Sequence, residues 1–105
     1  MSTTTAAPSV EAIIATLRIH EGELRRAGIR RLSLFGSVAR GESTRDSDID
    51  LAAELDPEAR IDLPSLIALE RRLAAILGRK VDLLAEPVEA SRLRARVEQD
   101  RRRAF

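Results

Sequence analysis

The chain has 105 residues, of which 44% are hydrophobic and 33% are charged, the proportions of one small folded domain. Its 18 basic and 17 acidic residues leave a net charge of only +1, so that any affinity for nucleic acid or anionic membranes must come from a local patch and not from the overall charge. There is no Cys, Trp or Tyr and there are two Phe, which excludes disulfides, thiolate metal sites and an aromatic platform for single strands, and argues against direct nucleic-acid binding.

The first segment, residues 1–9, is small and polar, and we expect it to be a flexible leader ahead of a folded domain over 10–105. It has no basic segment followed by an apolar run, and no stretch approaches the roughly 20 apolar residues of a membrane span. We therefore expect a soluble, cytoplasmic protein with no membrane partner. The absence of cysteine fits a reducing compartment.

Apolar residues recur at helical spacing from Val10 to Leu24, with Ser9 as a candidate N-cap and Gly28 as a candidate terminator. This pattern predicts a helix over about 10–26. His20 lies on that helix and is interpreted as a boundary residue, because no second histidine exists to share a metal.

Apolar spacing and turn residues predict the remaining elements. In chain order these are a strand over 30–35, a turn at 36–37, a helical turn over 38–41, a polar loop over 42–47, a strand over 48–53, a loop over 55–61, a helix over 63–77, a strand over 80–85 and a charged helix over 88–103. The order predicts a single α/β (α+β) domain in which helices cover a small mixed β-sheet. The arginines of the last helix are expected to face solvent, with a partner interface as the second interpretation.

Three aspartates alternate with apolar residues in the predicted strands. Asp48 and Asp50 flank Ile49, so that both carboxylates point to one face while the apolar side chains point to the other. Asp82 repeats the pattern between Val81 and Leu83. If the two strands are neighbours, three carboxylates converge and suit Mg²⁺, which takes its other ligands from water and substrate phosphates. The competing interpretation is that these aspartates face solvent and pair with basic residues.

Gly36 and Ser37 form a turn between a predicted strand and a short helix. Such a turn can bring backbone N–H groups and a hydroxyl up to a phosphate, with the positive end of the helix adding attraction. A Gly-Ser pair after a strand is also compatible with an ordinary cap or turn.

The turn and the aspartates occur in one order and at one spacing. Phe35-Gly36-Ser37, ten intervening residues and Asp48-Ile49-Asp50-Leu51 resemble the signature of the polymerase-β-like nucleotidyltransferase superfamily. The longer string from Gly36 to Glu42, followed by Ser47 to Leu51, resembles its MNT group of minimal nucleotidyltransferases. Val81-Asp82-Leu83-Leu84 matches the strand that carries the group's third carboxylate, and the similarity runs from about residue 10 to the last residue.

The resemblance implies a role for each matching position. Gly36 and Ser37 would hold the NTP phosphates, Asp48 and Asp50 would bind the Mg²⁺ ions that bridge them, and Asp82 would share a metal and help to deprotonate the acceptor. The implied activity is that of a nucleotidyltransferase (EC 2.7.7 type), which moves AMP from ATP to a hydroxyl group. Many MNT proteins are antitoxins that AMPylate a tyrosine of a HEPN-domain toxin, and the resemblance implies that partner here.

Several alternatives stay open from the sequence. Arg40 could reach the triphosphate, or it could pair with Glu42 or Asp46 and hold the loop. The chain could also be a non-catalytic antitoxin that neutralises its partner by direct binding. A transferase acting on a small molecule is disfavoured, because so short a chain lacks a second domain to form a deep acceptor pocket.

Overall fold

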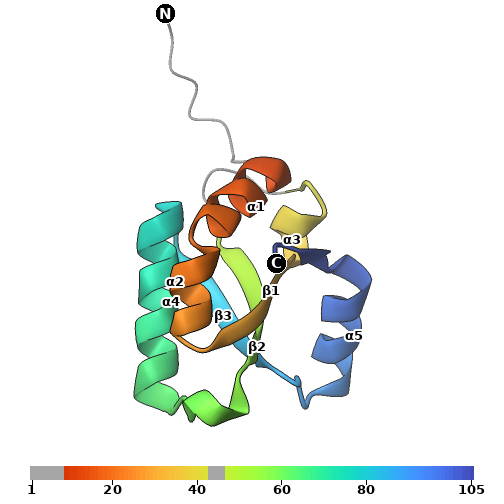
Figure 1. The fold of residues 1–105 in the computed structure, drawn as a ribbon. Helices are drawn as coiled ribbons and strands as arrows, with labels where there is room; N and C mark the ends of the chain where they lie inside the picture. The colour runs from red at the N-terminus through yellow and green to blue at the C-terminus, as the bar shows by residue number, and fades with distance from the viewer. Residues whose placement is uncertain (1–8, 43–46) are drawn as a thin grey trace, which may run out of the picture.

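A computed structural model describes residues 9–42 and 47–105. The expected leader therefore lies outside the described residues except for Ser9, as does most of the predicted polar loop. The described chain forms one four-stranded mixed sheet in the order β3-β2-β1-β4, with β1 antiparallel to β2 and β4, and β2 parallel to β3. Helices lie on both faces of this sheet (Figure 1), as the composition and element order predict.

The elements have the following bounds: α1 Val10–Ile19, α2 Glu21–Arg26, β1 Ile29–Phe35, α3 Gly36–Ala39, β2 Ile49–Leu55, a 3₁₀ turn Pro57–Ala59, α4 Leu63–Leu77, β3 Val81–Glu86, α5 Ser91–Asp100 and β4 Arg102–Arg103. The predicted helix over 63–77 is confirmed, with Asp62 accepting the N–H of Ser65 at its start and Gly78 in the left-handed conformation at its end. The other predicted strands agree with the structure to within two residues.

The period-two alternation of the strands divides the apolar residues between two cores. In β2, Ile49 and Leu51 belong to the main core, which α1, α2 and α4 cover. Ala52 points to the other face and joins a small cluster under α5 that contains Phe35 and Val97. Asp50 shares the face of Ala52 because side chains two positions apart point the same way. The acidic face of the sheet is therefore the one that α5 partly covers.

The single helix predicted over 10–26 is wrong in one respect, because the chain breaks into α1 and α2 at His20. The His20 N–H bonds to the Leu17 carbonyl, three residues back, and its ring Nδ1 lies 3.0 Å from the Thr16 carbonyl oxygen. Hydrogen bonds between residues three apart tighten the last turn of a helix and are common where a helix ends. Gly22, two residues later, also lowers the stability of a continuous helix at this point. The predicted N-cap is confirmed, since Ser9 Oγ accepts the Ala12 N–H at 3.0 Å.

The terminal helix predicted over 88–103 is also too long at both ends. It spans only Ser91–Asp100, and the chain then leaves the helix at Arg101 and pairs with β1. A continued helix would carry the last two side chains away from the sheet. The strand instead buries Ala104 and Phe105 in the main core, with the Ala104 N–H donated to the Leu32 carbonyl at 2.8 Å.

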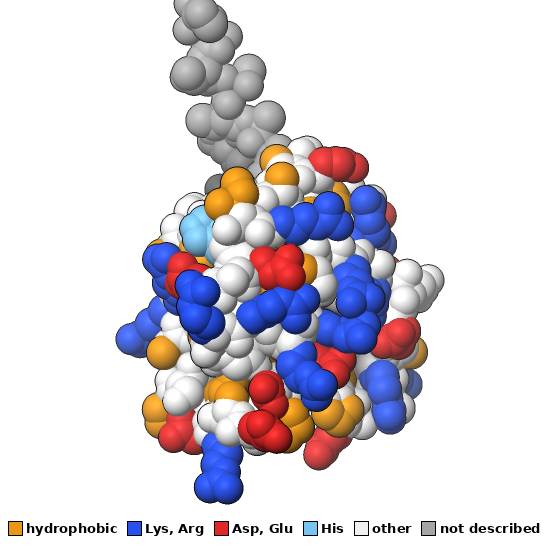
Figure 2. All heavy atoms as spheres, in the orientation of Figure 1, with side chains coloured by type: hydrophobic (Ala, Val, Ile, Leu, Met, Phe, Trp, Pro, Cys, Tyr) orange, Lys and Arg blue, Asp and Glu red, His pale blue; other side chains and the backbone are white. Residues whose placement is uncertain are grey.

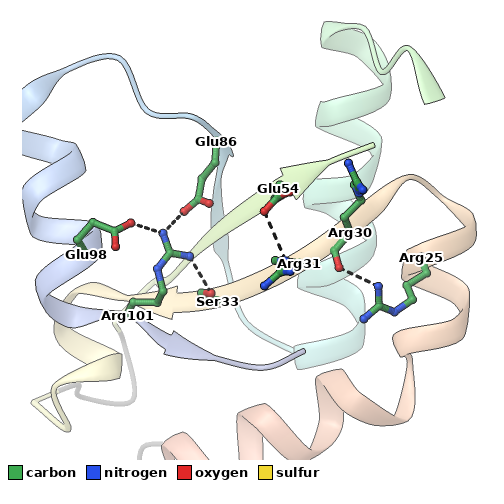
Figure 3. Close-up of polar contacts among 8 residues, drawn as sticks. All are labelled: Arg25, Arg30, Arg31, Ser33, Glu54, Glu86, Glu98 and Arg101. Carbon is green, nitrogen blue, oxygen red and sulfur yellow. Dashed lines mark hydrogen bonds and ion pairs between the residues drawn. The ribbon is translucent and has the colours of Figure 1, made fainter. Parts of the chain in front are cut away.

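Arg101 joins the end of α5 to the sheet (Figure 3). The sequence predicted that this arginine faces solvent, but its guanidinium is bonded within the protein instead. Its guanidinium donates to Ser33 Oγ at 3.0 Å on β1 and to Glu86 at 2.5 Å on β3. A third bond reaches Glu98 on α5 at 2.6 Å. Ser33 is buried, so this bond also satisfies its hydroxyl. Arg101 thus fixes α5 against the face of the sheet that carries Asp50.

Within the described part of the chain, every helix is too short or too polar to cross a bilayer. Figure 2 shows basic and acidic side chains interspersed over one face, with Lys and Arg numerous on the side of α5 and the C-terminal strand. Positive and negative side chains are therefore mixed on this face, in keeping with the near-neutral net charge.

Candidate active site

The turn after β1 packs directly against Asp50. Phe35 is the register partner of Asp50 in the antiparallel pair, so the next residue, Gly36, lies over the carboxylate. Gly36 has a φ of +76°, and a Cβ placed on it would lie 2.3 Å from Asp50 Oδ2. Only glycine meets both conditions without strain. The helical turn predicted over 38–41 begins two residues earlier, because α3 spans Gly36–Ala39 and so includes the Gly36-Ser37 pair.

Asp50 and Asp82 are brought together by the pairing of β2 with β3. The two strands are parallel and place Asp50 opposite Asp82, so both side chains belong to one face of the sheet. Asp50 is half-buried and Asp82 is exposed. The sequence predicted that these carboxylates converge if their strands are neighbours, and β2 and β3 are neighbours.

Asp48 lies immediately before β2, and its Oδ2 is 3.7 Å from Lys80 Nζ. Lys80 is 75% exposed, so this ion pair is a weak one. Across residues 9–42 and 47–105, no three histidine, cysteine or acidic side chains are grouped closely enough to hold one metal ion. The structure thus brings Asp50 and Asp82 together, with Asp48 beside them at the rim.

The surroundings of Asp50 disfavour the charged form of its carboxylate. Burial raises the pKa of Asp50 above its ordinary value of 3.8, and the charges of Asp82 and then Asp48 raise it further. Arg40 acts in the opposite direction and does not cancel these effects. A cation bound between the carboxylates would relieve this repulsion.

A cavity of about 560 Å³ contains most of the predicted site. This volume falls within the roughly 300–1,000 Å³ of small-molecule sites. Five of the predicted site residues line it: Gly36, Ser37, Arg40, Asp50 and Asp82. The other lining residues are Phe35, Glu70, Leu83, Leu84, Leu93 and Arg96. Asp48 is not among them. The cavity is therefore lined by polar groups together with leucines of β3 and α5.

Arg40 lines this cavity and is also held by two carboxylates. Its Nε lies 3.1 Å from Glu42, and its Nη1 lies 2.7 Å from Asp100 at the end of α5. The predicted pairing with Glu42 is present, whereas Asp46 lies outside the described residues. The Asp100 side chain is only 7% exposed, so this second bond joins α3 firmly to α5.

Sequence reasoning missed the contribution of α5 and of Glu70. Glu70 accepts the Leu83 N–H at 2.9 Å and so covers part of the free edge of β3. Leu93 and Arg96 are three residues apart on α5, and this spacing shows only that they share a helix face. The sequence does not show which face of α5 lies on the sheet, so it carries no signal that places Arg96 at the cavity.

A second cavity, of about 470 Å³, lies at the opposite ends of the strands, between the sheet and α5. Its walls include Leu55, Val88 and Val97, and Arg94 is among its charged lining residues. None of the predicted site residues lines it. The acidic pair and the Gly36-Ser37 turn therefore single out the first cavity as the candidate active site.

Comparison with known proteins agrees with this geometry. Residues 17–104 match the family model described as a nucleotidyltransferase domain. The chain is 41% identical over 80 residues to the protein adenylyltransferase MntA of Thermococcus cleftensis, covering 72% of this chain and 76% of that protein.

Two solved structures share the fold. One, classed provisionally as a minimal nucleotidyltransferase, superposes with a TM-score of 0.74 at 33% identity and covers 90% of this chain and 95% of its own. The other is a toxin–antitoxin crystal structure with AMP-PNP, with a TM-score of 0.70 at 25% identity, covering 88% and 72% of the two chains. The chain therefore belongs to the nucleotidyltransferase domain family and is a minimal nucleotidyltransferase similar to the MntA protein adenylyltransferases.

Proposed function

We propose that this chain transfers AMP from ATP to a tyrosine hydroxyl of a HEPN-domain toxin and so acts as the antitoxin of the pair. The observation that carries the proposal is the register pairing of Asp50 with Asp82 in a cavity that also contains the Gly36-Ser37 turn. Paired carboxylates beside a Gly-Ser turn suit nucleotidyl transfer, which needs positioning and charge neutralisation more than covalent help.

The pair of Asp50 and Asp82 fits a divalent cation, since Mg²⁺ is commonly held by one or two carboxylates together with substrate phosphates. Asp50 and Asp82 lie opposite each other on adjacent strands, and the pKa of Asp50 is raised because burial and the charges of Asp82 and Asp48 disfavour its charged form. In the proposal, Asp50 and Asp82 hold Mg²⁺, and Asp48 moves in from the rim to become its third carboxylate ligand. The ion would offset the charge of the carboxylates and of the triphosphate. Gly36 allows the backbone to approach the phosphates, and Ser37 offers its hydroxyl to them.

The reaction balances as a displacement at the α-phosphorus. The acceptor oxygen bonds to that phosphorus, and the bond from the phosphorus to the bridging oxygen of pyrophosphate breaks. Pyrophosphate leaves with the electron pair, while the hydroxyl proton passes to the carboxylate of Asp82. Arg40 lines the same cavity, and in the proposal it faces the triphosphate while Asp100 holds it in place.

The assignment of ATP and of a toxin partner rests on the relatives. The similar chain from Thermococcus cleftensis is a protein adenylyltransferase, and one structural relative is part of a toxin–antitoxin complex with AMP-PNP. The tyrosine acceptor and the HEPN class follow from the resemblance of Gly36 to Glu42 and Ser47 to Leu51 to the MNT group.

The test is label transfer to a HEPN-domain protein encoded beside this chain, in the presence of MgCl₂. ATP labelled on the α-phosphate should label that protein, whereas ATP labelled on the γ-phosphate should not. Asp50→Asn should lower the rate roughly 100- to 1,000-fold, the scale of losing one preorganised electrostatic contact. Chelation with EDTA should abolish labelling.

The matched control is Glu89→Gln, the same loss of charge at an exposed position outside the cavity. It should label its partner at the wild-type rate. Unchanged labelling by Asp50→Asn would refute the proposed chemistry. Toxin inhibition that persists in Asp50→Asn and without nucleotide would instead establish the alternative, a non-catalytic antitoxin that acts by binding.

A further inference from the structure

Helix α5 forms one wall of the candidate active site, and its rotation is fixed at two points. Val97 is 1% exposed under the helix, in the small core with Phe35. One turn later, Asp100 is bonded to Arg40, the residue that follows α3, at 2.7 Å. Residues three and four apart share a helix face, so these anchors turn the face of Leu93 and Arg96 toward the cavity. Both residues line it.

The two arginines of the cavity differ in their partners. Arg40 is bonded to Glu42 and Asp100, so much of its guanidinium is already used. In the described part of the chain, no carboxylate lies within ion-pair distance of Arg96, although Asp50, Asp82 and Glu70 line the same cavity. Arg96 is exposed at this wall and its donors are available to a ligand.

A guanidinium presents several N–H donors in a planar fork that matches phosphate oxygens. We propose that Arg96 binds the phosphate groups of the nucleotide from the α5 wall, opposite the aspartates of β2 and β3. The inference rests on the proposed nucleotidyl transfer and adds a residue to its binding site. It also gives Arg96 a partner, since it makes no ion pair with any residue that the structure describes, whereas Arg101 of the same basic segment is fully engaged by Glu86 and Glu98.

The experiment is titration calorimetry of the whole chain with Mg²⁺ and α,β-methylene-ATP, whose α–β bridge cannot be cleaved. Arg96→Gln should raise the Kd about 10-fold, the scale of losing one charge-assisted hydrogen-bond pair. Arg92→Gln removes the same charge from an exposed position of α5 that lines neither cavity, and it should change the Kd less than about 2-fold, a screened long-range effect. Arg96→Lys keeps the charge without the fork and should fall between the two.

Equal affinities for Arg96→Gln and Arg92→Gln would overturn the inference, provided that the wild type binds the nucleotide. A wild type that binds no nucleotide would refute the proposed function itself, so the two failures are distinguishable. Thermal unfolding of each variant checks that the fold is kept; Arg96 is exposed, and its replacement should leave the Tm unchanged. A weakened Arg96→Gln that also unfolds earlier, with a normal Arg96→Lys, would assign Arg96 a structural role and overturn the inference.

Discussion

Asp50 is half-buried beside two other aspartates, a position that opposes folding. Burial, Asp82 and Asp48 raise the pKa of Asp50 above its ordinary value of 3.8. The folded chain therefore binds this proton more tightly than the unfolded chain does. Stability falls as the pH rises from below 3.8 through the raised pKa, and the penalty is fully present at neutral pH.

Asp50→Asn should therefore stabilise the fold while it removes activity. We expect a gain of up to about 1 kcal/mol in the free energy of unfolding near pH 7, because solvent screens this partly exposed group. The gain should shrink near pH 3, where the unfolded and folded carboxyls are both protonated. Urea denaturation at the two pH values, with Glu89→Gln as the control, measures it. A loss of stability near pH 7 would contradict the expected repulsion.

Gly36 and Gly41 offer a matched pair for testing how the turn is built. Both have a φ of +76°, but only at Gly36 would a Cβ meet the Asp50 carboxylate; at Gly41 it would meet nothing within 4 Å. Each alanine variant should lose about 1–2 kcal/mol of stability from its backbone strain. Gly36→Ala should also displace Asp50 and slow AMP transfer roughly 100-fold.

The measurements are denaturant unfolding and the label-transfer assay on both glycine variants. Gly41→Ala should transfer label near the wild-type rate once it is assayed well below its Tm. Equal losses of activity in the two variants would show that the contact with Asp50 has no part in positioning the carboxylate.

At the scale of elements, α4 shows how local signals define a helix. Asp62 accepts the backbone N–H of Ser65 at 2.9 Å, and hydrogen bonds to Ser65 lower the pKa of Asp62 below 3.8. A lowered pKa in the folded state gives stability that is present above the unfolded pKa. It is lost as the pH falls through the folded pKa.

Asp62→Asn should keep the cap and remove its pH dependence, because an amide oxygen accepts the same N–H without titrating. Asp62→Ala should lower stability already at neutral pH, since the N–H then has no side-chain acceptor. Unfolding followed by circular dichroism between about pH 7 and pH 2.5 separates the three proteins. If Asp62→Asn loses as much stability at low pH as the wild type does, other carboxylates and not Asp62 account for the loss of stability in acid.

At the scale of the whole molecule, the last residues close the sheet and the main core together. Phe105 is 9% exposed, and its carbonyl accepts the Leu32 N–H at 3.2 Å. The guanidinium carbon of Arg25 lies 5.1 Å from the centre of its ring. These contacts join α2 and β1 to Phe105, two residues beyond β4.

Phe105→Ala should therefore lower the free energy of unfolding by about 3 kcal/mol, from lost burial and the cavity that remains. The control is Ile19→Ala, where the side chain is 80% exposed and the expected change is within about 0.5 kcal/mol. Thermal and urea unfolding of the two variants provide the comparison. Similar stabilities would mean that the C-terminal residue adds little to the core.

The sequence by itself determined the elements whose signals are local. The apolar stripe from Leu66 to Leu77, which ends at Gly78, predicted α4, and alternation predicted the strands that carry Asp50 and Asp82. The spacing of the Gly36-Ser37 turn from Asp48 and Asp50 predicted the nucleotidyltransferase family. Capping, side-chain periodicity and motif spacing depend on residues close in the chain, so the sequence alone reveals them.

Only the tertiary structure decided which distant residues meet. The register that sets Asp50 opposite Asp82, the bond from Arg40 to Asp100 and the place of Arg96 at the cavity all join separate elements. So does the strand after Arg101, where pairing with β1 and burial of the last residues outweigh the helical pattern. Such contacts depend on how whole faces pack against one another, and local propensity does not encode that geometry.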